Sequence, residues 1–232
     1  MARRPTASAS CSCQDWGRAT QCRSLPRRPR EEFELPADAT LYLVPQSLFK
    51  IHPANDALLA EVMARDPKGR LVFFAAPYDS VTAAFNTRLT ASLARHGLTL
   101  EERAIFLPYI PHAQYLRVNI VCDVMLDTVH WSGGNTSLDA LACGLPVVTL
   151  PGHLMRGRQS MAMLRLLGVD ELVASDPGDF VAKAVRVGTD RELRASLSAR
   201  IRAGLPTLFD RDEPIRELES FLERAVQEVR GS

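Results

Sequence analysis

The residues best suited to chemistry follow the short apolar segment 124–126. Gly133 and Gly134 stand directly before Asn135, Thr136 and Ser137, where the sequence predicts the start of a helix. Glycines let the backbone approach a ligand closely, and the free amides and positive dipole end of a helix start suit a phosphate. In the alternative interpretation, Asn135 or Thr136 only caps the helix and the glycines only form a turn. The spacing matches neither the dinucleotide fingerprint G-x-G-x-x-G nor the nucleoside-triphosphate loop G-x-x-x-x-G-K-[ST].

A lysine follows the first apolar segment of the chain. Lys50 lies in a stretch without any Asp or Glu, from Ala39 to Asn55. Such a lysine could neutralise a diphosphate as a point charge, and it could equally be a surface side chain that keeps its ammonium in water. His52 is better explained as structural, because no acid or nucleophile is paired with it in the sequence.

Two further loops could contact a ligand. Pro108 and Pro111 fix the backbone ahead of His112, which leaves free carbonyl and amide groups to face a base, although the spacing alone favours a rigid connector. The segment 151–158 alternates Gly and Arg ahead of another helix, which fits either an anion contact or a solvated turn.

These loops must be positioned by alternating strands and helices. Short apolar runs bounded by turn residues are typical of strands buried on both faces of a parallel sheet. They are expected at 41–44, 71–74, 104–107, 124–126, 147–150 and, briefly, 172–173. Helical spacing is expected at 55–65, 80–96, 112–121, 136–142, 158–167, 179–187, 191–202 and 213–229. Ser80 is the expected cap of its helix, and Phe221, Leu222, Ala225 and Val226 are expected to dock the last helix on a neighbour.

This alternation predicts an α/β fold, a doubly wound, Rossmann-like parallel sheet with helices on both faces. In such sheets ligands bind beyond the carboxyl ends of the strands, where the loops described above lie. We expect one lobe at 33–230, preceded by a disordered basic extension at 1–32.

Composition supports that boundary. The 232 residues carry a net charge of +1, yet residues 1–30 hold seven Arg against one acid, Asp15, and little aliphatic surface to bury. Residues 1–30 are interpreted as a bland extension or misplaced start, a targeting segment or a partner-binding arm, and their deletion should leave the melting temperature unchanged. The global charge gives no reason to propose nucleic-acid binding, and no run is long enough for a membrane span.

The cysteines offer little chemistry. Cys11 and Cys13 lack the second ligand pair of a zinc site, while Cys122 and Cys143 stand in apolar contexts typical of buried, inert thiols. The loops that follow the predicted strands contain no Asp-x-Asp triplet, so no metal is expected. An odd cysteine count without a secretory signal favours a cytoplasmic protein.

Taken in order, five segments resemble the C-terminal catalytic lobe of the protein O-linked N-acetylglucosamine transferases, which usually follow tetratricopeptide repeats. The segments are 45–53, 106–111, 123–128, 133–139 and 144–152, and the resemblance extends from Leu41 to Val226. It implies the C-terminal half of a two-lobed GT-B fold, and a UDP-sugar donor with a protein or peptide acceptor.

The resemblance also implies roles for particular residues. Lys50 would contact the pyrophosphate and stabilise the departing UDP, which makes it the catalytic residue, with Gln46 or Ser47 nearby. The remaining contacts would come from three groups: Ile110 and His112 at the uracil and ribose, Gly133, Gly134, Asn135 and Thr136 at the phosphates, and Asp139 at the ribose. The family often has Lys where His112 stands, and the animal enzymes have His-Thr-Thr where this chain has Gly134-Asn135-Thr136.

The resemblance therefore implies transfer of N-acetylglucosamine from UDP-N-acetylglucosamine to Ser or Thr of proteins, without a metal. The acceptor lobe and the repeats of the family are not recognisable in this sequence, so the chain is expected to be an incomplete enzyme. A non-catalytic UDP-sugar-binding module or pseudoenzyme is the alternative. A third possibility is an independent enzyme on another doubly wound fold, such as an epimerase, although paired carboxylates near the glycines are missing.

Overall fold

The apolar runs of the chain form one five-stranded parallel sheet in the computed structural model, which describes residues 30–209 and 211–231. The strands are β1 (Thr40–Leu43), β2 (Gly69–Phe74), β3 (Ala104–Leu107), β4 (Val124–Leu126) and β5 (Val147–Val148). Their order is β3-β2-β1-β4-β5, and every neighbouring pair is parallel. Leu43 of β1 pairs with Val72 on one side and with Met125 on the other.

Both faces of the central strands are covered, which explains their continuous apolar sequences. Leu41, Tyr42 and Leu43 of β1 are completely buried, and so are Leu71 and Val72 of β2. Burial of Tyr42 leaves its hydroxyl in need of a partner, so this group donates to Asp66 Oδ2 at 2.9 Å.

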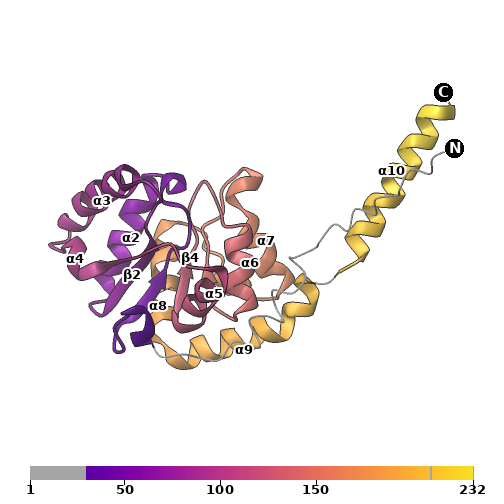
Figure 1. The fold of residues 1–232 in the computed structure, drawn as a ribbon. Coiled ribbons are helices and arrows are strands. Elements are labelled where there is room, and N and C mark those ends of the chain that lie inside the picture. The colour runs from indigo at the N-terminus through magenta and orange to yellow at the C-terminus, as the bar shows by residue number, and fades with distance from the viewer. Residues whose placement is uncertain (1–29, 210, 232) are drawn as a thin grey trace, which may run out of the picture.

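Helices on the two faces complete the lobe (Figure 1). They are α2 (Ala54–Arg65), α3 (Asp79–Ala94), α4 (Leu100–Arg103), α5 (His112–Val121), α6 (Asn135–Ala142), α7 (Gln159–Leu166), α8 (Pro177–Thr189), α9 (Arg191–Leu208) and α10 (Glu213–Gly231). Short 3-10 helices occur at η1 (Arg30–Phe33), η2 (Leu48–Lys50), η3 (Met155–Gly157) and η4 (Asp170–Leu172). Helix α2 packs against α3 and α8, and α5 packs against α6. The expected α/β fold with flanking helices is confirmed.

Two local expectations were wrong. The segment 172–173 is not a strand: Val173 makes one isolated bridge to Thr149, because η4 precedes it and the cap of α8 follows closely at Asp176. Ser80 is not a helix cap either, since α3 begins at Asp79 and its N-cap position is Tyr78.

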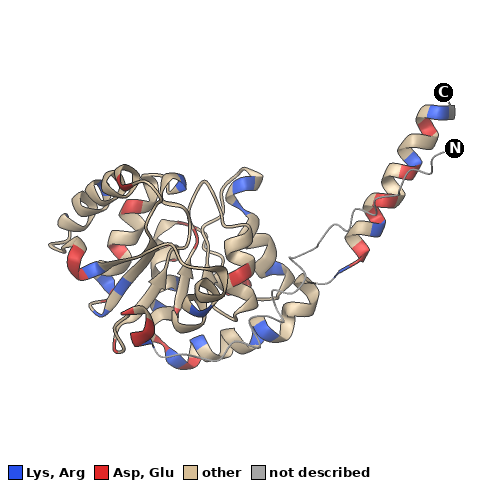
Figure 2. Cartoon of the chain, viewed as in Figure 1, with Lys and Arg blue, Asp and Glu red and all other residues tan. Residues whose placement is uncertain are grey.

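The two ends of the described chain also differ from expectation. Arg30 belongs to η1 and its guanidinium is bonded to the body, so the expected extension at 1–32 overlaps an ordered element. Helix α10 extends away from the sheet, with acidic and basic residues interspersed along it (Figures 1 and 2). Phe221 and Leu222 are 57% and 52% exposed, so within the described residues α10 does not dock on a neighbouring helix. Helical spacing identifies the apolar side of a helix but not what covers it.

The cysteine prediction is confirmed where it can be followed. Cys122 and Cys143 are buried free thiols, and burial raises the pKa of Cys122. Cys11, Cys13 and most of the basic extension lie outside the described residues. None of the described helices combines the length and apolar character that a membrane crossing needs.

Candidate functional site at the carboxyl edge of the sheet

The sheet order creates a switch point between β1 and β4. The chain leaves β1 toward β2 and β3, then returns to β4 on the other side of β1 and continues to β5. The loops that follow β1 and β4 therefore diverge from adjacent strands, which is where open α/β sheets bind ligands. Lys50 follows β1 and the glycine pair follows β4, so topology brings the two strongest sequence candidates to one place.

A buried aspartate organises the loop between β4 and α6. Asp127 Oδ1 accepts the backbone N–H of Gly133 at 2.7 Å, and Oδ2 accepts the hydroxyls of Ser132 at 2.6 Å and Thr149 at 2.7 Å. Burial raises the pKa of Asp127, and these hydrogen bonds oppose that rise. Asp127 thereby joins the loop to the end of β5.

Serine hydroxyls extend this network to the neighbouring helices. The Ser160 backbone N–H at the start of α7 donates to Ser132 Oγ at 3.0 Å, and the Ser160 hydroxyl lies 2.7 Å from that of Ser137 in α6. All three serines are buried. Sequence reasoning missed this network; the one available signal was a carboxylate directly after a buried strand with hydroxyl residues in the following loop.

Close contacts favour glycine at both positions, more strongly at Gly133, since the contact at Gly134 is with the flexible end of one side chain. A Cβ on Gly133 would collide with the Ser137 hydroxyl and lie 2.6 Å from Thr136 Oγ1, and one on Gly134 would lie 2.9 Å from Gln159 Oε1. The N-cap position of α6 is Gly134, and no side chain caps the helix. The interpretation in which Asn135 or Thr136 caps the helix is therefore wrong. Both residues belong to the first turn of α6, with Asn135 exposed and Thr136 half-buried.

Lys50 lies against the loop between β4 and α6, residues 127–134, which we call the glycine loop. Its ammonium is 5.4 Å from the centre of the Trp131 ring and 5.7 Å from that of Phe49. Gln46 Nε2 donates to the Trp131 carbonyl at 3.3 Å, which joins the loop after β1 to the loop after β4. Ser47 is exposed. The structure thus brings Lys50 and Gln46 together with the segment before Gly133.

His52 plays a structural part in the same region. Its Nδ1 accepts the Ala54 N–H at 3.1 Å at the start of α2, and its ring meets that of His130 edge-on at 4.5 Å. His130 has a positive φ of 70°, in the left-handed region that is uncommon for residues other than glycine. Asn55 Oδ1 fixes this turn by accepting the Val129 N–H at 2.9 Å.

The residues expected at the base and ribose come together from α5 and α6. His112 Nε2 at the start of α5 lies 3.6 Å from Asp139 Oδ2, with His112 half-exposed and Asp139 buried. Ile110 is partly buried against the core. Because Asp139 is one turn after Asn135 and Thr136, α6 carries the two groups of predicted contacts on one short element.

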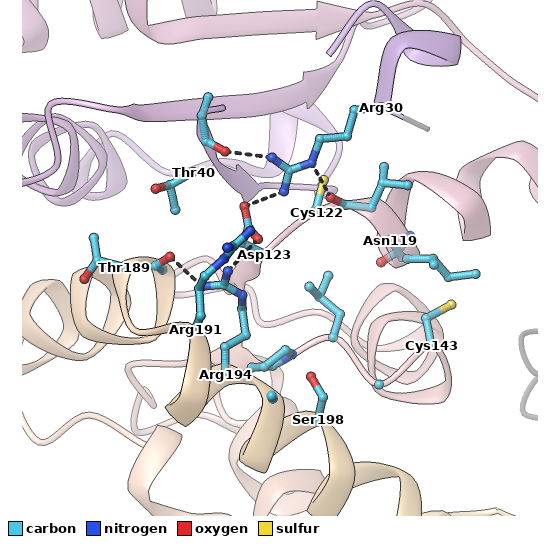
Figure 3. Close-up of a pocket in the computed structure, with 18 of the residues that line it drawn as sticks. Arg30, Thr40, Asn119, Cys122, Asp123, Cys143, Thr189, Arg191, Arg194 and Ser198 are labelled. Atoms are coloured by element: carbon cyan, nitrogen blue, oxygen red, sulfur yellow. Dashed lines mark hydrogen bonds and ion pairs between the residues drawn. The ribbon is translucent and has the colours of Figure 1, made fainter. Parts of the chain in front are cut away.

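A cleft of about 860 Å³ lies at the opposite edge of the sheet, beside the amino ends of β1 and β4 (Figure 3). Two of its arginines, Arg30 and Arg194, are engaged in structural contacts. Arg30 and Arg194 pair with opposite oxygens of Asp123 at 2.7 and 3.1 Å, and Arg194 also donates to the Gly188 carbonyl at 2.6 Å. These contacts join η1, the start of β4 and the α8–α9 connection, and the cleft is separate from the candidate site.

The strand order and the flanking helices define an α/β lobe of the type found in GT-B glycosyltransferases. The chain belongs to glycosyl transferase family 41, whose sequence pattern matches residues 13–213. The resemblance to O-linked N-acetylglucosamine transferases is thereby confirmed.

Curated relatives bear names that agree with this family. A UDP-N-acetylglucosamine–peptide N-acetylglucosaminyltransferase of Caenorhabditis elegans is 29% identical over 195 residues, which are 83% of this chain and 16% of that protein. A probable enzyme of the same name from Arabidopsis thaliana, SEC, is 25% identical over 82% of this chain and 19% of the relative. The chain thus spans less than a fifth of the length of these relatives.

Solved structures agree in fold. The O-GlcNAc transferase of Thermobaculum terrenum, solved as a K341M mutant, matches with a TM-score of 0.70 at 30% identity, over 86% of this chain and 39% of that one. Anabaena HepE, solved in complex with UDP and glucose, matches with a TM-score of 0.62 over 84% of this chain and 51% of its own. At 17% identity, HepE supports the fold alone.

Proposed function

We propose that this chain binds UDP-N-acetylglucosamine and forms the donor lobe of an enzyme that transfers N-acetylglucosamine to Ser or Thr of proteins. The observation that carries the proposal is that Lys50 lies beside the glycine loop at the switch point. Its ammonium is near the Trp131 ring, and Gln46 is hydrogen-bonded to the Trp131 carbonyl. The proposal draws further support from family membership and from the names of the relatives.

Each site residue has a proposed part. Lys50 is the catalytic residue, because its ammonium can stabilise the negative charge that develops on the departing diphosphate. The backbone from Gly133 to Thr136 offers amides to the phosphates, with Gln46 and Ser47 nearby. The ribose and base lie along α6 and α5, where Asp139 accepts from ribose hydroxyls and Ile110 and His112 border the base.

Catalysis on this view is positioning plus electrostatic stabilisation, and needs no metal ion. An acceptor hydroxyl must still be held in line with the sugar. We propose that a further lobe, and in the manner of the family tetratricopeptide repeats, supply that function in the complete enzyme. This proposal agrees with the small share of each relative that the chain spans.

The direct test compares UDP with uridine by calorimetric titration of the chain. UDP should bind more tightly, and Lys50→Ala should weaken UDP by about 10- to 100-fold while leaving uridine almost unaffected, since a charge-assisted phosphate contact contributes about 1.5–3 kcal/mol. Lys68→Ala is the matched control, because Lys68 is an exposed lysine beside the opposite edge of the sheet. Equal loss of both ligands in Lys50→Ala, or no UDP binding by the unaltered chain, would contradict the proposal.

A second candidate is a non-catalytic module that binds the UDP-sugar only. It is favoured by one observation: the described residues form a single sheet with one candidate site. The two candidates share the same donor contacts, so nucleotide binding does not separate them. Sugar transfer to peptides does.

A further inference from the structure

Lys50 is held by aromatic rings rather than by a carboxylate. Its ammonium lies within 6 Å of the ring centres of Trp131 and Phe49, the range in which cation–π attraction acts. Among residues 30–209 and 211–231, no acidic side chain forms an ion pair with it. The sequence from Ala39 to Asn55 also carries no acid.

The group that contacts Lys50 determines how much of its positive charge can act on a bound anion. A carboxylate beside Lys50 would fix the ammonium but would also neutralise most of its field. An aromatic face attracts the ammonium through its quadrupole and carries no net charge, so the full positive charge remains available to an anion.

Trp131 is itself fixed in place. Its carbonyl accepts hydrogen bonds from Gln46 Nε2 at 3.3 Å and from Thr128 Oγ1 at 2.7 Å. Trp131 is 45% exposed, so it contributes little to the core and its position at the surface requires another explanation. Phe49, in the same 3-10 helix as Lys50, is 71% exposed and raises the same question.

We propose that Trp131 and Phe49 form an aromatic clamp that positions the ammonium of Lys50 toward the glycine loop without neutralising it. Trp131 and Phe49 are positioning residues that act through Lys50. The use of the clamp for a diphosphate rests on the proposed function, whereas the clamp itself is a property of the free chain and can be measured without any nucleotide.

The first experiment detects the clamp directly. Lys50, Lys68 and Lys183 are the lysines of the chain, so incorporation of lysine labelled with 13C at Cε gives a simple NMR spectrum. The ε-methylene protons of Lys50 should resonate upfield of those of exposed Lys68, because the ammonium next to them lies over the Trp131 ring. Trp131→Leu should move them toward the Lys68 position, and Phe221→Leu, on distant α10, should not. Coincident Lys50 and Lys68 signals in the unaltered chain would overturn the clamp.

The second experiment asks whether the clamp serves phosphate binding. Trp131→Leu should weaken UDP by about three- to tenfold with uridine unaffected, and Trp131→Phe should retain most of the affinity. Combined with Lys50→Met, Trp131→Leu should cause no further loss, because its effect passes through the lysine. A loss that persists in the Lys50→Met background, or that extends to uridine, would show that Trp131 contacts the ligand itself and would overturn the positioning role. Failure of UDP to bind the unaltered chain would refute the proposed function, and the NMR result would still decide the clamp.

Discussion

Asp127 accepts the backbone N–H of Gly133 at 2.7 Å and thereby fixes the position of Gly133 in the glycine loop. The same carboxylate takes hydroxyls from Ser132 and Thr149, so a single buried side chain connects β4, its loop and β5. A loop built in this way is set before any ligand arrives. Preorganised amides cost no rearrangement when negative charge develops beside them.

The first prediction concerns the charge of Asp127. Because burial raises its pKa, the folded chain keeps a proton on this carboxyl to higher pH than the unfolded chain does. The free energy of unfolding should therefore fall as pH rises above the unfolded value of about 3.9, by up to about 1.4 kcal/mol per pH unit. Asp127→Asn removes this titration.

Urea unfolding at several pH values checks this. The stability of the unaltered chain minus that of Asp127→Asn should decrease as pH rises from about 4. Constant offsets from altered hydrogen bonds do not affect this slope. A difference that increases with pH would mean that the hydrogen bonds to Asp127 outweigh its burial.

The second prediction has the opposite sign. Asp176 caps α8 by accepting the Asp179 N–H at 2.9 Å, and this backbone hydrogen bond, with help from Ser175, lowers the pKa of Asp176. Its contribution is present above the unfolded pKa and is lost as pH falls through the lowered value. Asn caps a helix about as well and does not titrate. Melting curves should show the unaltered chain losing stability below pH 4 relative to Asp176→Asn, and a pH-independent difference would be the contrary result.

The third prediction tests the close approach at Gly133. A Cβ there collides with Ser137 and Thr136, so Gly133→Ala should distort the loop, cost about 1–3 kcal/mol of stability and weaken UDP by about tenfold or more. Gly152→Ala is the control, because the nearest atom to its added Cβ is 3.6 Å away, an ordinary contact. Calorimetry of both variants decides the matter. Unchanged UDP affinity in Gly133→Ala would remove the glycine loop from the phosphate site.

The fourth prediction concerns the contacts that attach η1 to the sheet. Arg30 donates to the Val121 carbonyl at 3.0 Å, to the Ala39 carbonyl at 2.7 Å and to Asp123 at 2.7 Å, which ties η1 to the sheet. Arg30→Ala should lower the melting temperature by several degrees, because it leaves partly buried acceptors unpaired. Arg65→Ala, which removes only an exposed pair with Glu61, should change it little. Equal effects of the two substitutions would contradict the anchoring role.

The sequence predicts the sheet well for a physical reason. Segments such as Ala104–Leu107 are short, apolar and bounded by turn residues, so local information is enough to place them. The strand predicted at 172–173 was wrong because two apolar residues between helical turns are too few to form a ladder of strand hydrogen bonds. The predicted docking of α10 was wrong because the surface that covers a helix lies elsewhere in the sequence and cannot be read from the helix itself.

The candidate site likewise has a part that could be predicted from the sequence and a part that could not. Topology rules bring the loops after β1 and β4 together, so Lys50 and the glycines could be predicted as neighbours. The Asp127–Ser132–Ser160 network could not, since it joins positions far apart in the sequence by hydrogen bonds that no local spacing records. Trp131 escaped notice for a similar reason: an exposed aromatic acquires meaning only when its cation is seen beside it.

The last prediction separates the two proposed functions. In-line attack requires the acceptor hydroxyl within about 3–3.5 Å of the anomeric carbon, and positioning of this kind contributes about 7–11 kcal/mol. The proposed donor contacts come from the loops after β1 and β4 and from α5 and α6, all on one lobe. The 232-residue chain, assayed by itself, should therefore bind UDP but transfer no radiolabelled N-acetylglucosamine to Ser/Thr peptides, with donor hydrolysis followed in parallel. Transfer that appears on adding an acceptor lobe from a longer relative would favour the enzyme, and binding without transfer in that mixture would favour the non-catalytic module. Robust transfer by the chain alone would overturn the prediction and place the acceptor on this lobe or on a second copy of it.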